Sequence, residues 1–101
     1  MGEVRIEHLG EGRFRLAGEL SFGTVGGLLS QTDALFASAP MLEIDLQGVV
    51  RSDSTGLALL VEWLRESARR GKEIRFVNLP PQMLAIARVS NLDQLLAPAG
   101  E

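Results

Sequence analysis

A strand, helix and strand that follow one another in the middle of the chain limit the fold more than any other feature. Residues 42–46 alternate between apolar and polar side chains, which is the period of a strand with one buried face. Apolar residues recur at helical spacing over residues 57–68, and residues 74–77 are again strand-like. Strands joined through a helix lie parallel, with a right-handed crossover. The sequence therefore predicts an α/β fold on a largely parallel sheet.

The flanking segments extend this pattern at both ends. Residues 4–9 and 13–17 alternate around Glu11-Gly12 and predict a hairpin. The predicted order is β-β-α-β-α-β-α-α, over residues 4–9, 13–17, 25–36, 42–47, 57–68, 74–77, 83–89 and 93–96. Residues 49–53 are expected to form a short connection. We expect one domain over residues 1–101, a mixed sheet of about four strands with three to four helices packed on it, and a frayed tail after about residue 97.

Composition excludes several classes of function. With 46% hydrophobic residues and a net charge of -3, the chain can form a compact core but has no basic surface for nucleic acid. It has no cysteine, and its one histidine, His8, is predicted on a strand surface, so no metal site is expected. It has no run of about 18 apolar residues and no secretory signal. We expect a cytoplasmic protein without a cofactor and without direct membrane insertion.

Polar residues gather where the second predicted helix begins. Asp53, Ser54 and Thr55 are residue types that cap helices, because their side-chain oxygens accept hydrogen bonds from free backbone N–H groups. Capping alone explains their presence. Ser54 as a nucleophile would need a base and an oxyanion hole, but His8 is the one histidine and no Gly-x-Ser-x-Gly or Walker motif is present. We expect no catalytic residue.

The same segment resembles a known family. Asp45-Leu46, then a loop, then Asp53-Ser54-Thr55-Gly56-Leu57 is similar to the STAS family of sulfate-transporter cytosolic domains and anti-sigma-factor antagonists. Gly18-Glu19-Leu20 also resembles the family, and the likeness covers nearly the whole chain. The resemblance implies a STAS-like fold that docks the start of this helix onto a partner protein. It also implies that Ser54 matches the phosphorylation site of the antagonists, where added negative charge would block docking.

Two branches of the family differ in their partner. The stretches 56–61 and 87–92 resemble the MlaB-like STAS subunits of ABC complexes that move phospholipid between Gram-negative membranes. This branch implies a non-catalytic subunit, peripheral to the inner membrane, that binds an MlaF-like ATPase and thereby the permease, and so supports outer-membrane lipid asymmetry. Residues 53–56 are closer to the antagonists, whose partner is a serine-kinase anti-sigma factor. We favour the transporter subunit, with Ser54 as an unmodified docking contact.

The expected partner surface follows the second predicted helix from its start. Its candidate residues are Arg51, Ser52, Asp53, Ser54, Thr55, Ala58 and Glu62. Glu62 could equally be an ordinary solvated residue. Trp63 could fill the core or anchor an interface, and its place beside the main apolar stripe favours burial. Glu62 and Glu66 among the arginines argue against a membrane-surface helix.

Overall fold

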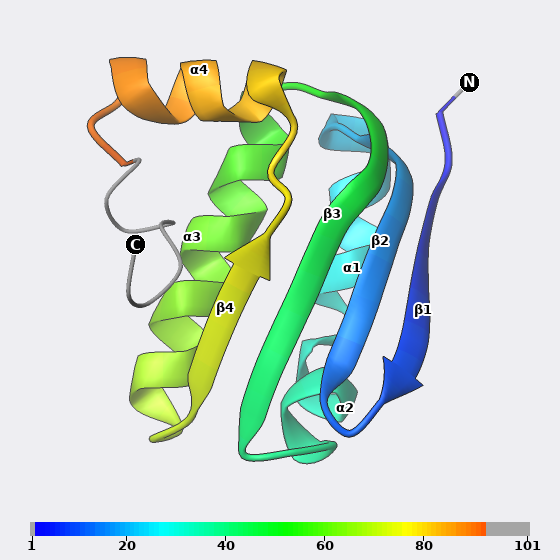
Figure 1. Cartoon of the computed structure of the whole chain (residues 1–101), viewed down its shortest axis with the longest axis vertical. Coiled ribbons are helices and arrows are strands. Elements are labelled where there is room, and N and C mark those ends of the chain that lie inside the picture. Colours follow the sequence, from blue (N-terminus) through cyan, green and yellow to red (C-terminus); the bar gives the residue numbers. More distant parts are fainter. Residues whose placement is uncertain (1, 93–101) are drawn as a thin grey trace.

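The computed structural model describes residues 2–92 and contains one four-stranded sheet in the order β1-β2-β3-β4, with helices behind it (Figure 1). Strands β1 and β2 are antiparallel, and the other neighbours are parallel. The elements are β1 (Val4–Gly10), β2 (Arg13–Leu20), α1 (Phe22–Leu29), α2 (Thr32–Ala37), β3 (Met41–Ser52), α3 (Ser54–Arg69), β4 (Glu73–Val77) and α4 (Pro81–Val89). The predicted mixed sheet is confirmed, while the turn expected over 93–96 and the tail lie outside the described residues.

The opening hairpin is confirmed, and a register shift between His8 and Gly10 separates its tight turn from the rest of the strand pairing. Glu11 has a φ of 47° and Gly12 a φ of 80°, so both turn residues are in the left-handed region. Two such residues form the turn whose twist matches that of the flanking strands. The strands pair from Val4 opposite Gly18 to His8 opposite Phe14.

Two boundaries differ from the prediction. The connection expected over residues 49–53 is strand up to Ser52, because β2 continues to Leu20 and, after a register shift at Val50, pairs with Arg51 and Ser52. The helix expected over residues 25–36 is two helices, α1 and α2. At the break, the Ser30 hydroxyl donates to the Gly27 carbonyl at 2.7 Å. This bond competes with the backbone ladder.

The core lies between the sheet and α3. The buried face of α3 is formed by Gly56, Leu57, Leu59, Leu60, Trp63 and Ser67. Trp63 is fully buried, as predicted, and its indole N–H donates to Thr32 Oγ1 at 3.0 Å. Ala68, expected in the apolar stripe, is exposed, because the stripe that meets the sheet runs through Trp63 and Ser67 instead.

The other end of α3 is at Arg69, one residue beyond the helical period predicted over residues 57–68. Gly71 has a φ of 64°, and its N–H donates to the Ala68 carbonyl, while the Lys72 N–H donates to the Ser67 carbonyl at 2.8 Å. This paired arrangement satisfies the last carbonyl groups of the helix. It also turns the chain directly into β4.

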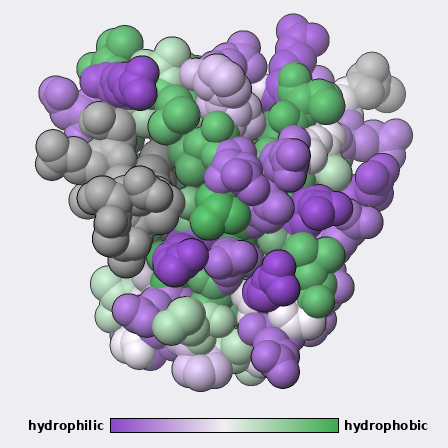
Figure 2. All heavy atoms as spheres, viewed as in Figure 1, coloured by the Kyte–Doolittle hydropathy of each residue, from purple (hydrophilic) through white to green (hydrophobic). Residues whose placement is uncertain are grey.

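On the face of the sheet seen in Figure 2, hydrophilic side chains lie among smaller hydrophobic areas. Glu43 lies between Arg13, at 3.7 Å, and Arg75, at 3.1 Å, and Arg15 lies 4.0 Å from Asp45. These pairs join directly opposed positions of β2, β3 and β4. The alternation predicted for β2 and β3 therefore separates a buried apolar face from a solvated one.

Candidate functional site

The first turn of α3 is capped by Asp53. Its backbone is extended, with φ -107° and ψ -171°, and its carboxylate accepts a hydrogen bond from the Thr55 N–H at 2.8 Å. The Gly56 N–H donates to the Asp53 carbonyl at 3.0 Å. The capping role predicted for Asp53 is therefore confirmed, since two of the free N–H groups at this end of the helix find acceptors.

Removing this cap should loosen the first turn without unfolding the domain. We expect Asp53→Ala to lower the free energy of unfolding by about 1 kcal/mol, the usual cost of losing a helix cap. Asp53→Asn is the matched control, because its amide oxygen can still accept from Thr55. Urea unfolding of both variants measures the difference. Equal loss in the two variants would show that charge, and not capping, is what Asp53 contributes.

Gly56 and Ser52 hold this turn against the rest of the fold. A Cβ on Gly56 would clash with the Ser52 hydroxyl and would lie 2.8 Å from the Leu20 Cβ. The Asp53 N–H donates to the Leu20 carbonyl at 3.1 Å, and the Ser52 N–H donates to Gln82 Oε1 at 3.3 Å. The start of α3 is thus fixed to the end of β2 and to α4.

Ser54 is the motif residue that these contacts leave free. Its side chain is exposed, and within residues 2–92 its hydroxyl makes no hydrogen bond. Ala58 is exposed one turn further along, and the half-buried Glu62 follows after another turn. Residues spaced by four lie on one side of a helix. Ser54, Ala58 and Glu62, called the α3 docking line below, therefore form a continuous strip.

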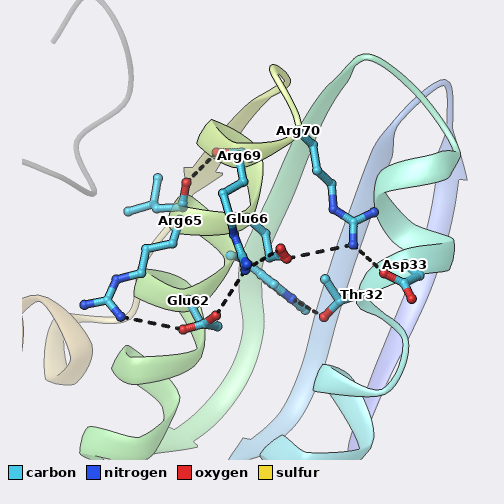
Figure 3. A network of polar contacts seen from close by, with 10 residues as sticks. Thr32, Asp33, Glu62, Arg65, Glu66, Arg69 and Arg70 are labelled. Carbon is cyan, nitrogen blue, oxygen red and sulfur yellow. Dashed lines mark hydrogen bonds and ion pairs between the residues drawn. The ribbon is translucent and has the colours of Figure 1, made fainter.

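Glu62 is held within a network of charges (Figure 3). Its carboxylate lies 3.9 Å from both Arg65 and Arg69, and Arg69 also contacts Glu66 at 2.6 Å. Arg70 joins Glu66 to Asp33 on α2. The hydrogen bond to Asp33 raises the pKa of Arg70, and the nearby Glu66 charge adds to this effect. The acidic end of the α3 docking line is therefore already paired with cations.

The structure brings most of the predicted partner residues together but corrects one of them. Arg51, Asp53, Ser54 and Ala58 are exposed, and Thr55 and Glu62 are half-buried. Ser52 is only 4% exposed, and its hydroxyl donates to the Asp53 carbonyl at 3.0 Å. Ser52 therefore positions the turn and offers no surface to a partner.

Two exposed apolar side chains near this edge of the sheet did not follow from the sequence reasoning. Phe22 begins α1 and is 87% exposed, and Val50, near the end of β3, is 83% exposed. Phe22 comes soon after β2 and Val50 lies within β3, and the ends of these two strands pair at Leu20 and Ser52, next to the first turn of α3. The positions of these residues in the sequence could have indicated their exposure. Phe22 directly follows the serine that caps α1, and Val50 follows the buried Val49, so its side chain lies on the opposite face of the strand.

Within residues 2–92, the structure places the one histidine of the chain at the other end of the sheet from Ser54. His8 is exposed and stacks on Phe14, with ring centroids 4.6 Å apart. The first turn of α3 is joined to the other end of β2, at Leu20. Leu20 is roughly 20 Å from Phe14 along the strand, at about 3.3 Å per residue.

A polar depression of about 500 Å³ lies next to Asp53 and is lined by Glu19, Arg51 and Gln82 among others. Within residues 2–92, no cluster of His, Asp or Glu is arranged to hold a metal ion, and no helix is long and apolar enough to cross a membrane.

This mixed four-stranded sheet with its helices is the architecture of a STAS domain, and solved structures share the fold. The phosphorylated form of the Bacillus cell fate determinant SpoIIAA matches with a TM-score of 0.70 at 18% identity, over 97% of this chain and 92% of that one. The unphosphorylated form of the anti-sigma factor antagonist SpoIIAA matches with a TM-score of 0.66 at 16% identity, over 84% and 81% of the two chains. At these identities the likeness establishes the fold.

The sequence comparisons place the chain within one family of STAS domains. Residues 5–97 match the family described as "Mlab, STAS domain", and the chain belongs to that family. The intermembrane phospholipid transport system binding protein MlaB of Haemophilus influenzae is 30% identical over an alignment of 86 residues, and the match covers 81% of this chain and 82% of that protein. The resemblance inferred from residues 53–57 is thereby confirmed.

Proposed function

We propose that this chain is a non-catalytic subunit of an ABC complex that transports phospholipid, and that it binds the ATPase of that complex through the α3 docking line. In this proposal it is cytoplasmic and reaches the inner membrane, and the permease, only through the ATPase. Its membership in the MlaB family supports the transport system. The observation that carries the docking site is the exposed Ser54 on a turn whose other residues are all fixed by contacts within the fold.

The surface suits a protein partner better than a small substrate. Ser54 offers a hydroxyl that can donate and accept, and Ala58 lets another backbone or side chain approach closely. Phe22 adds exposed aromatic area at the same edge, and aromatic residues are enriched where interfaces are strongest. Because Glu62 is already paired with arginines, we expect it to influence the orientation of the bound partner more than the affinity of the complex.

A pair of arginine substitutions on one helix tests this proposal. We expect Ala58→Arg to weaken binding to the ATPase at least about tenfold, because it puts a long charged side chain in the middle of the contact. Ala68→Arg is the matched control, since Ala68 is exposed on α3 but lies off the α3 docking line. The measurement is co-purification from the native host with a C-terminal tag, followed by titration with the recovered partner. Equal binding by both variants would exclude this side of α3.

The second candidate is an anti-sigma-factor antagonist, which the Asp53-Ser54-Thr55-Gly56 sequence favours. Its partner would be a soluble serine kinase, and phosphorylation of Ser54 would end the association by adding negative charge beside Asp53. The same co-purification separates the two. Recovery of an ATPase with a permease supports the transport subunit. Recovery of a serine kinase, with no ATPase or permease, supports the antagonist and makes phosphorylation of Ser54 the next measurement.

A further inference from the structure

The outer edge of β1 is unpaired within residues 2–92, because β1 ends the sheet and has β2 on one side only. The Glu19 N–H donates to the Glu3 carbonyl at 2.8 Å, so this pair lies in a hydrogen-bonded position of the hairpin. Such positions alternate along antiparallel strands, which assigns Arg5 and Glu7 to bonds with β2. The N–H and carbonyl groups of Val4, Ile6 and His8 therefore point away from the sheet.

The helix layer stops short of this edge. On the helix side of β1, Val4 and Ile6 are half-buried and His8 is exposed. Two hollows of about 290 and 300 Å³ lie there and share Ile6 and Gln31 in their linings. A Cβ built on Gly23 or Gly27, on the α1 wall, meets nothing within 4 Å. The edge of β1 thus combines unpaired backbone groups with an uncovered apolar strip.

We propose that β1 is a homodimerisation edge, which pairs antiparallel with β1 of a second copy about a two-fold axis at Ile6. This inference is independent of the proposed partner of α3. In this register Ile6 faces Ile6 of the second copy and Val4 faces His8, and all of them use their outward backbone groups. The sequence of β1 favours this register, because two opposite charges, Arg5 and Glu7, lie on either side of Ile6.

The charges on the open face of the sheet identify a second copy as the occupant. Arg5 and Glu7 flank Ile6 and are both exposed. In the two-fold register Arg5 lies directly across from Glu7 of the second copy, and Glu7 lies across from its Arg5. These are non-hydrogen-bonded pairs, in which opposed side chains come closest. A strand of another protein would have to reproduce this charge order, whereas β1 supplies it to itself.

The helix layers leave room for this pairing. Helix α1 packs on β2, so the α1 helices of two copies would be separated by roughly 14 Å, or three interstrand spacings of about 4.8 Å. That gap exceeds the 8–10 Å or so at which helices pack directly. It is occupied by the side chains of Val4, Ile6 and His8 from both copies. Because the contact is one strand wide, we expect association at micromolar concentrations and not an obligate dimer.

Two charge reversals test the proposal, alone and mixed. Arg5→Glu places acid against acid across the axis, and Glu7→Arg places base against base. Each variant alone should dimerise at least about tenfold more weakly than the unchanged chain. An equimolar mixture should recover the dimer, because each copy then faces the opposite charge at both positions. Sedimentation velocity over a series of concentrations measures all three samples.

Three outcomes would overturn the proposal. They are a monomer at every concentration of the unchanged chain, full dimerisation of both single variants, and failure of the mixture to recover the dimer while both variants remain folded. Thermal melting checks folding, since Glu7 lies across from Arg15 in its own chain and its reversal adds a like-charge contact. Ala58→Arg should leave the dimer unchanged, which separates this edge from the α3 docking line.

Discussion

Trp63→Ala is expected to destabilise the domain more than any other single substitution discussed for it, by about 3–5 kcal/mol. Trp63 is fully buried between α3 and the sheet, and its loss leaves a cavity that the surrounding Leu residues cannot fill. It also leaves Thr32 Oγ1 without its donor, and so loosens α2 from α3. Small domains have a total stability of about 5–15 kcal/mol, so the variant should be partly unfolded near body temperature. Urea unfolding monitored by circular dichroism measures the change.

Trp63→Phe is the control that separates packing from hydrogen bonding. It retains an aromatic ring in the core and removes the indole N–H, so its cost should be clearly smaller than that of Trp63→Ala. A cost below about 1 kcal/mol for Trp63→Ala would contradict the structure. It would then follow that the ring belongs to an interface, as tryptophan often does.

Gly56→Ala is expected to destabilise the domain by about 1–3 kcal/mol, although alanine is the better helix former. The added methyl group would press against the Ser52 hydroxyl and the Leu20 side chain, both of which are buried. Relieving this contact means moving the first turn of α3 away from the end of β2. The variant should therefore also weaken partner binding, through displacement of Ser54.

The same substitution at Gly26 supplies the opposite expectation. Gly26 lies within α1, and a Cβ built there meets nothing within 4 Å. Gly26→Ala should therefore stabilise the domain by up to about 1 kcal/mol through helix propensity alone. Chemical unfolding of the two variants side by side compares one methyl group in two environments. Stabilisation by both would show that the contact of Gly56 with Ser52 does not limit packing.

The fold was predictable from the sequence wherever the period of apolar residues was strong. Residues 42–46 and 57–68 have such periods, and the strand and helix found there match the prediction. The end of β3 was predicted wrongly, since Val49 to Ser52 show no alternation of their own and become strand by pairing with β2. The break between α1 and α2 was also missed, because the apolar period of residues 25–36 continues across it.

The candidate site was predictable to the extent that it lies on one helix. Ser54, Ala58 and Glu62 share a side of α3 through helical spacing alone. The bond from the Ser52 N–H to Gln82 joins residues that are far apart in sequence and lie close only in the folded chain. The exposure of Phe22 and Val50 and the free edge of β1 likewise depend on how elements are placed in three dimensions. Sequence periodicity describes elements one at a time, so it could not supply these features.

The hydrogen bonds that tie the start of α3 to Leu20 and Gln82 have a consequence for the kinetics of association. A surface that is ordered before the encounter loses little conformational entropy when a partner arrives. Association then proceeds without waiting for a loop to fold, and affinity is adjusted mainly through the rate of dissociation. A hydroxyl held at the end of such a rigid turn can change the lifetime of a complex while the structure of the free protein stays as it is.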